Sequence, residues 1–155
     1  MAFKLIRQRG AVQVTPLFVR VLGSGTINSG SVVEFHRATN NNRVEPASSA
    51  TTYTTIFGIA LDYVQGASDS YTRVIPFVPG QFWEADCANF PATAQVLIRH
   101  ALTDARTINN TSTNVNAATG VFFIHSISRT IFASQSTGTF RVIGEFLRSP
   151  ASYSL

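Results

Sequence analysis

The chain has 155 residues, of which 45% are hydrophobic and twelve are Phe, so it can form one domain with a substantial buried core. The formal net charge of +4 lies in residues 1–33, which hold four cations and no acid, whereas eight arginines balance eight acids in the rest. The only cysteine, Cys87, excludes an intramolecular disulfide, and we expect it to be a buried apolar thiol.

The first nine residues form a basic, apolar leader. Lys4, Arg7 and Arg9 interrupt its apolar run and no small-residue cleavage pattern follows, so a secretory signal is not indicated. No stretch approaches the roughly 20 apolar residues of a membrane-spanning helix. We therefore expect a protein made in the cytoplasm, without a membrane partner, whose leader binds an acidic surface or a neighbouring subunit.

Alternation of apolar and polar residues with a period of two predicts β-strands throughout the body. In residues 56–64 this period places Phe57 and Ile59 on one face and Gly58 and Ala60 on the other. Further strands are predicted at residues 12–22, 32–37, 71–78, 95–102, 121–128 and 139–147, with an aromatic strand that ends at Cys87. Pro76 indicates an edge, a bulge or a strand end.

The connections are rich in Gly, Asn, Ser and Thr. Residues 23–30 are predicted to be a turn or hinge, and residues 38–55 and 107–120 to be loops. A helix over residues 94–105 is the main competing interpretation of the strand predicted there. Many short strands with polar connections indicate an all-β fold, a compact antiparallel barrel or sandwich.

The residues that could support chemistry are sparse and scattered. His36, His100 and His125 form no paired metal-ligand spacing, so no metal and no cofactor is expected. Cys87, a distant His and Asp104 could in principle assemble a hydrolase, but no nucleophile-elbow motif is present. We therefore expect a protein that binds rather than an enzyme, with His125 as a satisfied core or interface side chain.

Nucleic-acid binding is a further alternative, because the isoelectric point is high and β platforms with aromatic side chains can stack bases. The body itself is neutral, however, and its arginines alternate along the chain with acids. That arrangement favours ion pairing at surfaces or interfaces over a continuous phosphate track. No nucleic-acid partner is therefore expected.

Residues 56–87 read as strand, Gly-containing turn, strand, Pro-Gly turn and aromatic strand. Together with Arg99-His-Ala-Leu-Thr-Asp104 and Val142-Ile-Gly-Glu-Phe-Leu-Arg-Ser-Pro150, this half of the chain resembles the capsid decoration proteins of tailed bacteriophages, also called cement or auxiliary head proteins. The resemblance implies a tulip-like β body that forms a homotrimer on the outer surface of a virion, with extended arms on the major capsid protein. It contains no catalytic motif.

On this interpretation the chain divides into an N-terminal arm and first strand (residues 1–22), a β body (residues 23–148) and a C-terminal tail (residues 149–155). The leader matches no family motif, so its role rests on charge and hydropathy alone. The residues expected to bind the capsid or a neighbouring subunit are Phe3, Lys4, Leu5, Ile6, Arg7 and Arg9. Several such arms on one oligomer would act as a multivalent clamp.

A second interpretation is a receptor- or glycan-binding module of a phage tail or fibre. Exposed aromatic side chains stack on sugars, and Tyr53, Tyr63, Trp83 and Tyr153 are the candidates. For Trp83 a core or interface position is favoured, because large aromatic side chains are usually buried.

Overall fold

The computed structural model describes residues 3–9, 14–22, 25–36, 43–65, 70–89, 91–111, 118–128 and 140–148. Within these residues the regular structure is strand, apart from a 3-10 turn at Thr93–Gln95. The strands are β1 (Phe3–Gln8), β2 (Leu17–Val21), β3 (Thr26–Ile27), β4 (Val32–Phe35), β5 (Arg43–Pro46), β6 (Ile56–Ala60), β7 (Val64–Gln65), β8 (Tyr71–Pro76), β9 (Gln81–Cys87), β10 (Arg99–Asp104), β11 (Thr107–Asn109), β12 (Phe122–Ile127) and β13 (Phe140–Phe146). The expected all-β barrel is confirmed.

The first barrel is closed by β2, β5, β4, β6 and β8, in that order. Closure comes from β2, which pairs in parallel with β5 and antiparallel with β8. The interior holds tightly packed apolar side chains, among them Val21, Val33, Val44, Phe57 and Val74. The short strands β3 and β7 pair with each other in a separate two-stranded sheet.

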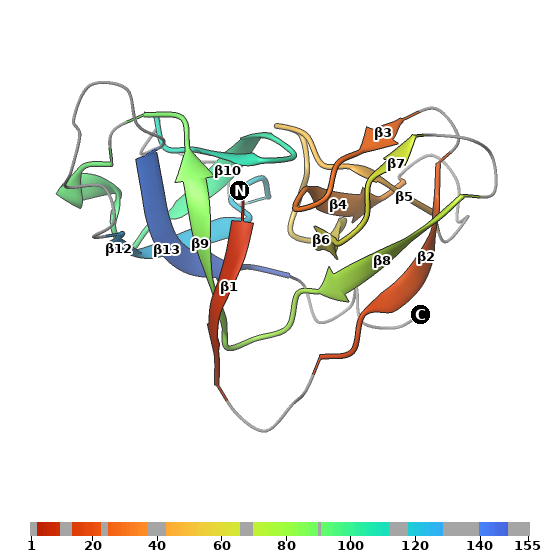
Figure 1. Cartoon of the computed structure of the whole chain (residues 1–155). Coiled ribbons are helices and arrows are strands. Elements are labelled where there is room, and N and C mark those ends of the chain that lie inside the picture. The colour runs from red at the N-terminus through yellow and green to blue at the C-terminus, as the bar shows by residue number, and fades with distance from the viewer. Residues whose placement is uncertain are drawn as a thin grey trace.

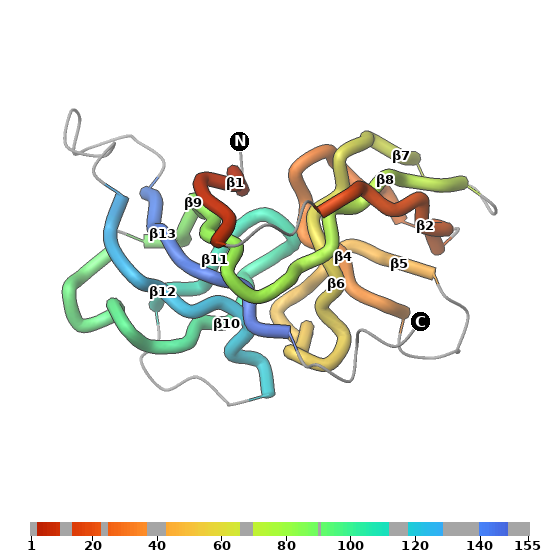
Figure 2. Tube along the Cα trace, turned by 90° about the horizontal axis from the view of Figure 1, so that it is seen from below, coloured from red at the N-terminus to blue at the C-terminus, as the bar shows by residue number. Residues whose placement is uncertain are grey.

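The second barrel consists of β9, β13, β12, β10 and β11. Its ring closes on β9, which pairs antiparallel with β13 and bridges β11 in parallel at Cys87 and Ile108. β1 adds to this barrel by antiparallel pairing with β9. The two barrels lie side by side, with β9 and β13 in one and β2, β4, β5, β6 and β8 in the other (Figures 1 and 2).

One hydrophobic core crosses from barrel to barrel. The ring of Phe146 stacks on Phe77 with centroids 3.9 Å apart, and lies 5.2 Å from Phe3 and 4.8 Å from Phe122. Ile56 of the first barrel belongs to the same buried cluster. Because aromatic side chains bury large areas, this cluster joins the two barrels into one packed unit.

Most predicted strands are present, some of them shorter than expected. Residues 32–37, 71–78, 121–128 and 139–147 contain β4, β8, β12 and β13, and Pro76 ends β8 as expected. The region of residues 95–102 is divided: a 3-10 turn comes first and β10 begins at Arg99, so the helix alternative is wrong. Three regions expected to be turns or loops contain the short strands β3, β5 and β11.

The predicted faces of β6 are also wrong. Ile56 and Ile59 pack in the core that joins the barrels, whereas Phe57 and Ala60 pack inside the first barrel. The pairing register between β4 and β6 shifts at this point and leaves Phe57 as an extra residue. Such a bulge interrupts the period of two, so one short strand serves both cores.

The structure corrects one part of the expected architecture, the arm separate from the body. Phe3–Gln8 is the strand β1, paired along its length with β9, and Phe3 is buried in the shared core. The physical reason is that Phe3 and Leu5 alternate with charged side chains, so the strand can bury one face and keep its cations on the other. Residues 149–155, the expected tail, lie outside the described residues.

We expect Phe3→Ala to lower the free energy of unfolding by about 3 kcal/mol, because it leaves a cavity against Phe146 in the shared core. The matched control is Ile6→Ala, three residues along the same strand, whose side chain is 48% exposed and should change stability little. Urea denaturation measures both values. Equal, small losses in the two variants would mean that β1 is not docked in solution.

Candidate binding face

Strand β1 lies at the end of its sheet. It pairs with β9 on one edge, and within the described residues no strand pairs with its other edge. An unpaired edge presents backbone N–H and C=O groups that can accept a further strand. The cations of the leader flank this edge, which is therefore the starting point for a binding site.

A bulge in β1 determines which side chains point outward. Leu5 pairs with Trp83 and Arg7 pairs with Phe82, so Ile6 is the extra residue between them. Without the bulge, strict alternation would turn Arg7 towards the core that Leu5 packs against. The bulge instead keeps Arg7 on the outer face, and it leaves Ile6 exposed beside it.

Two guanidinium groups cover one aromatic ring on that face. The Cζ atoms of Arg7 and Arg9 lie 4.8 and 5.1 Å from the centre of the Phe82 ring. The backbone N–H of Arg9 donates to the carbonyl of Gly80 at 2.9 Å, which fixes the chain just beyond β1. Cation–π contacts of this kind hold the two charges in place while their N–H groups stay available to a partner.

The ring of Phe82 belongs to a small cluster of rings that also contains His125 and Phe123. The ring of His125 lies 5.0 Å from that of Phe82 and 5.0 Å from that of Phe123. Its Nε2 atom lies 3.3 Å from Oε2 of Glu145, without the geometry of a hydrogen bond. His125 is thus half-buried between two rings and a carboxylate. The expectation of a satisfied side chain is wrong for its Nε2 atom, which has no hydrogen-bond partner within the described residues.

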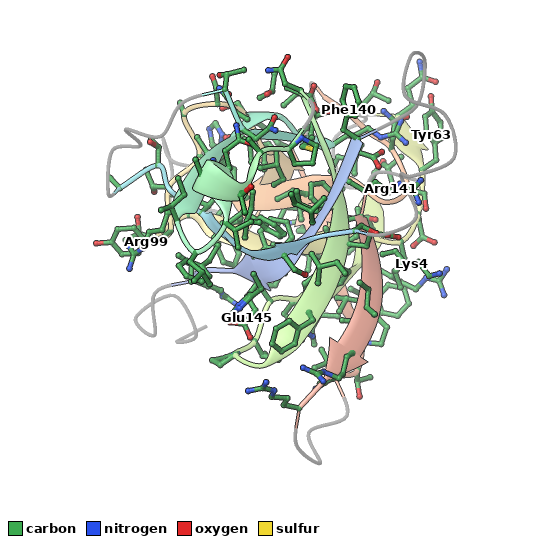
Figure 3. The ribbon with its side chains drawn as sticks, turned by 90° about the vertical axis from the view of Figure 1, so that its left-hand side faces the viewer. Lys4, Tyr63, Arg99, Phe140, Arg141 and Glu145 are labelled. Carbon is green, nitrogen blue, oxygen red and sulfur yellow. The ribbon has the colours of Figure 1, made fainter. Side chains whose placement is uncertain are left out.

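Charged side chains form a ladder across the neighbouring strands. Lys4 lies opposite Glu84, and Arg141 reaches both Glu84, at 3.5 Å, and Asp86, at 3.1 Å. Partial burial raises the pKa of the Asp86 carboxyl, while the charge of Arg141 opposes this shift. Figure 3 looks onto this side of the second barrel, with Lys4 on β1 and Arg141 and Glu145 on β13.

We call Lys4, Ile6, Arg7, Arg9 and Phe82 the binding face. Four of its members are among the six residues predicted from sequence. The other two predicted residues, Phe3 and Leu5, pack inward against the core. Phe82 was missed, because an apolar residue in a strand gives no sequence signal that cations will cover it; only the register of β1 against β9 reveals the contact.

The residues considered for catalysis are dispersed. Cys87 is buried, and burial raises the pKa of its thiol to about 12, with a further contribution from the Asp86 charge. His100 is buried and its Nε2 atom lies 2.9 Å from the carbonyl of Gln95, while His36 pairs with Glu45 at 3.0 Å. In the described parts of the chain, no three His, Cys, Asp or Glu side chains lie close enough to hold a metal ion.

The aromatic residues proposed for glycan stacking differ in exposure. Tyr63 is 61% exposed and Tyr53 is also exposed, whereas Trp83 lies in the shared core, as favoured from sequence. Tyr153 is outside the described residues. A stacking site built around Trp83 is therefore excluded.

Two hollows lie away from the binding face. An apolar groove of about 380 Å³ on the first barrel is lined by Leu17, Phe18, Phe35 and Tyr71, and Phe18 is 75% exposed. A polar pocket of about 450 Å³ lies between the barrels. An exposed apolar patch is typical of a protein–protein contact, whereas a polar pocket fits a small hydrogen-bonding ligand.

We expect Cys87 to resist iodoacetamide at pH 8 in the folded protein and to react once the chain is unfolded in urea. The thiolate is the reactive form, and a folded pKa near 12 leaves almost none of it at that pH. Because the pKa is raised on folding, this thiol should cost stability as the pH rises above its unfolded value of about 8.5 towards the folded one. Mass spectrometry detects the adduct, and rapid labelling of folded protein would contradict the buried state.

None of the protein-family models, curated proteins and solved structures with which the chain was compared matches it. Among the described residues there is no helix whose length and hydropathy would let it cross a membrane.

Proposed function

We propose that this chain is a structural protein of a bacteriophage virion, one that decorates the outside of the capsid by binding the major capsid protein as a homotrimer. The single observation that carries the proposal is the outer edge of β1, with which no strand of the described residues pairs, together with the outward-facing cations beside it. An edge strand together with fixed charges suits recognition of another protein, and it supplies no catalytic group. The proposal therefore includes no cofactor, no metal and no enzymatic activity.

The partner segment that fits this face is extended and acidic. An added strand would pair with the backbone of β1, which gives affinity without regard to sequence. Carboxylates on that strand would pair with Lys4, Arg7 and Arg9, since the planar guanidinium group can bind a carboxylate through two hydrogen bonds. Phe82 holds Arg7 and Arg9 in place beforehand, which lowers the entropy lost on binding.

Oligomerisation supports such attachment, because several weak contacts on one particle act together. On the described surface, the groove with Leu17, Phe18 and Tyr71 is the apolar patch suited to contact between copies. It belongs to the first barrel, whereas the binding face belongs to the second. A trimer could thus join its first barrels and leave three copies of β1 open to the capsid.

The alternative is a receptor- or glycan-binding module of a tail or fibre. Exposed Tyr53 and Tyr63 support it, but Trp83 is buried and contributes nothing to such a surface. A strand edge flanked by cations favours a protein partner over a sugar. Imaging particles with and without the protein distinguishes the two, because a decoration protein occupies the capsid surface and a tail module does not.

Charge reversal at Arg7 tests the face. We expect Arg7→Glu to reduce co-sedimentation with undecorated capsids roughly tenfold at low salt, with a smaller effect at high salt. The matched control is Arg99→Glu on β10, an exposed arginine of the same barrel that lies across β12 and β13 from the binding face. Equal occupancy by both variants would show that another surface carries the binding.

Light scattering tests the assembly. We expect a mass three times the 16.8 kDa of the chain at micromolar concentration, and a lower mass for Phe18→Ser. Tyr63→Ser, an exposed aromatic outside the residues that line the groove, serves as the control and should leave the mass unchanged. A monomeric wild-type protein would remove the multivalent clamp from the proposal.

A further inference from the structure

The polar pocket between the barrels has walls from both. Thr26 of β3, with Asn28 and Ser31 between β3 and β4, forms the wall on the side of the first barrel, and Asp86, Asp104 and Arg106 come from the second barrel. The turn between β10 and β11 faces the first barrel at this point (Figure 1). No residue of the pocket belongs to the binding face, so the inference below does not depend on the proposed capsid attachment.

Backbone contacts hold the two walls together. The N–H of Val32 donates to the carbonyl of Ala105 at 2.7 Å, and Ser48 forms an isolated β-bridge with Asp104. The Oδ1 atom of Asp104 accepts the N–H of Arg106 at 2.7 Å, which fixes the carboxylate and the turn. The pocket is therefore formed before any ligand arrives, so binding does not lose the conformational entropy of ordering its walls.

The two carboxylates of the pocket have hydrogen-bonding capacity to spare. Asp86 uses Oδ1 for Arg141 and Asp104 uses Oδ1 for Arg106, so within the described residues each carboxylate keeps Oδ2 for a ligand. Ser31 lines the same pocket and is only 2% exposed. A ligand hydroxyl that donates to a carboxylate oxygen forms a charge-assisted hydrogen bond, which is stronger than one between neutral groups.

The charge of the pocket is close to balanced. Arg106 lines it beside the two carboxylates, and Arg141 pairs with Asp86 from outside. An anion would meet the carboxylates, and a cation would meet the arginines. A neutral ligand avoids both penalties and can still use every donor and acceptor.

We propose that this pocket binds a neutral polyhydroxylated ligand, a sugar ring. Adjacent ring hydroxyls donate to Oδ2 of Asp86 and of Asp104, and ring oxygens accept from Asn28, Ser31 and Arg106. A hollow of about 450 Å³ has the capacity for such a ring. This site differs from the aromatic stacking surface considered above, because no aromatic side chain lines it.

The test is a titration of isotope-labelled full-length protein followed by amide NMR. The probes are glucose, galactose, mannose, rhamnose and N-acetylglucosamine, each at millimolar concentration. We expect at least one of them to shift the amide signals of Asn28, Ser31 and Arg106 in a saturable way. Asp104→Asn keeps the Oδ1 acceptor for Arg106 but converts Oδ2 into a donor, and it should weaken binding about fivefold, the effect of one lost hydrogen bond.

Two controls separate the pocket from general effects. Asp62→Asn makes the same change at an exposed carboxylate that pairs with Arg73, and it should leave the affinity unchanged. Guanidinium chloride at non-denaturing concentration and inorganic phosphate serve as charged probes. The proposal is overturned if no sugar shifts the pocket signals, if either ion shifts them as strongly as the sugars do, or if Asp104→Asn binds like wild type while its spectrum remains that of a folded protein.

Discussion

The packing of Phe146 against four other aromatic rings is the contact on which the rest of the structure depends. Phe77 arrives from the end of the first barrel, Phe3 from β1, and Trp83 and Phe122 from the second barrel. Each ring belongs to a different part of the chain, so this one cluster fixes how the barrels meet. Without this cluster each barrel would have to fold as a separate small unit, and small units bury a smaller fraction of their surface than larger ones do.

The binding face depends on this core through β9. Trp83 and Ala85 point from β9 into the cluster, so Phe82 and Glu84, which precede each of them in the strand, point to the opposite face. Phe3 anchors β1 beside β9 in the same cluster. The bulge at Ile6 then places Arg7 over Phe82, so the position of a surface charge is determined by a buried phenylalanine.

The sequence allowed the strand content to be predicted, because long runs with a period of two are a strong signal; β8, β12 and β13 are examples. Short strands such as β5 and β11 were missed, since three or four residues within Asn- and Thr-rich segments show no periodicity of their own. β1 was assigned to an arm because its cations dominate the composition of the leader. Neither Phe82 nor the polar pocket could be found from sequence, because both are created by pairings between distant segments, β1 with β9 and β4 with the turn after β10.

The order of the strands along the chain has a consequence for folding. All strands of the first barrel lie between residues 17 and 76, whereas the second barrel is built from β1 at one end of the chain and β9 to β13 at the other. During synthesis the first barrel has all its partners once residue 76 has emerged, but β1 must wait for β9. Closing so long a loop is slow. Until β1 pairs with β9, the apolar side chains of Phe3 and Leu5 remain exposed to solvent. During that time a chaperone or another nascent chain can bind the N-terminal segment.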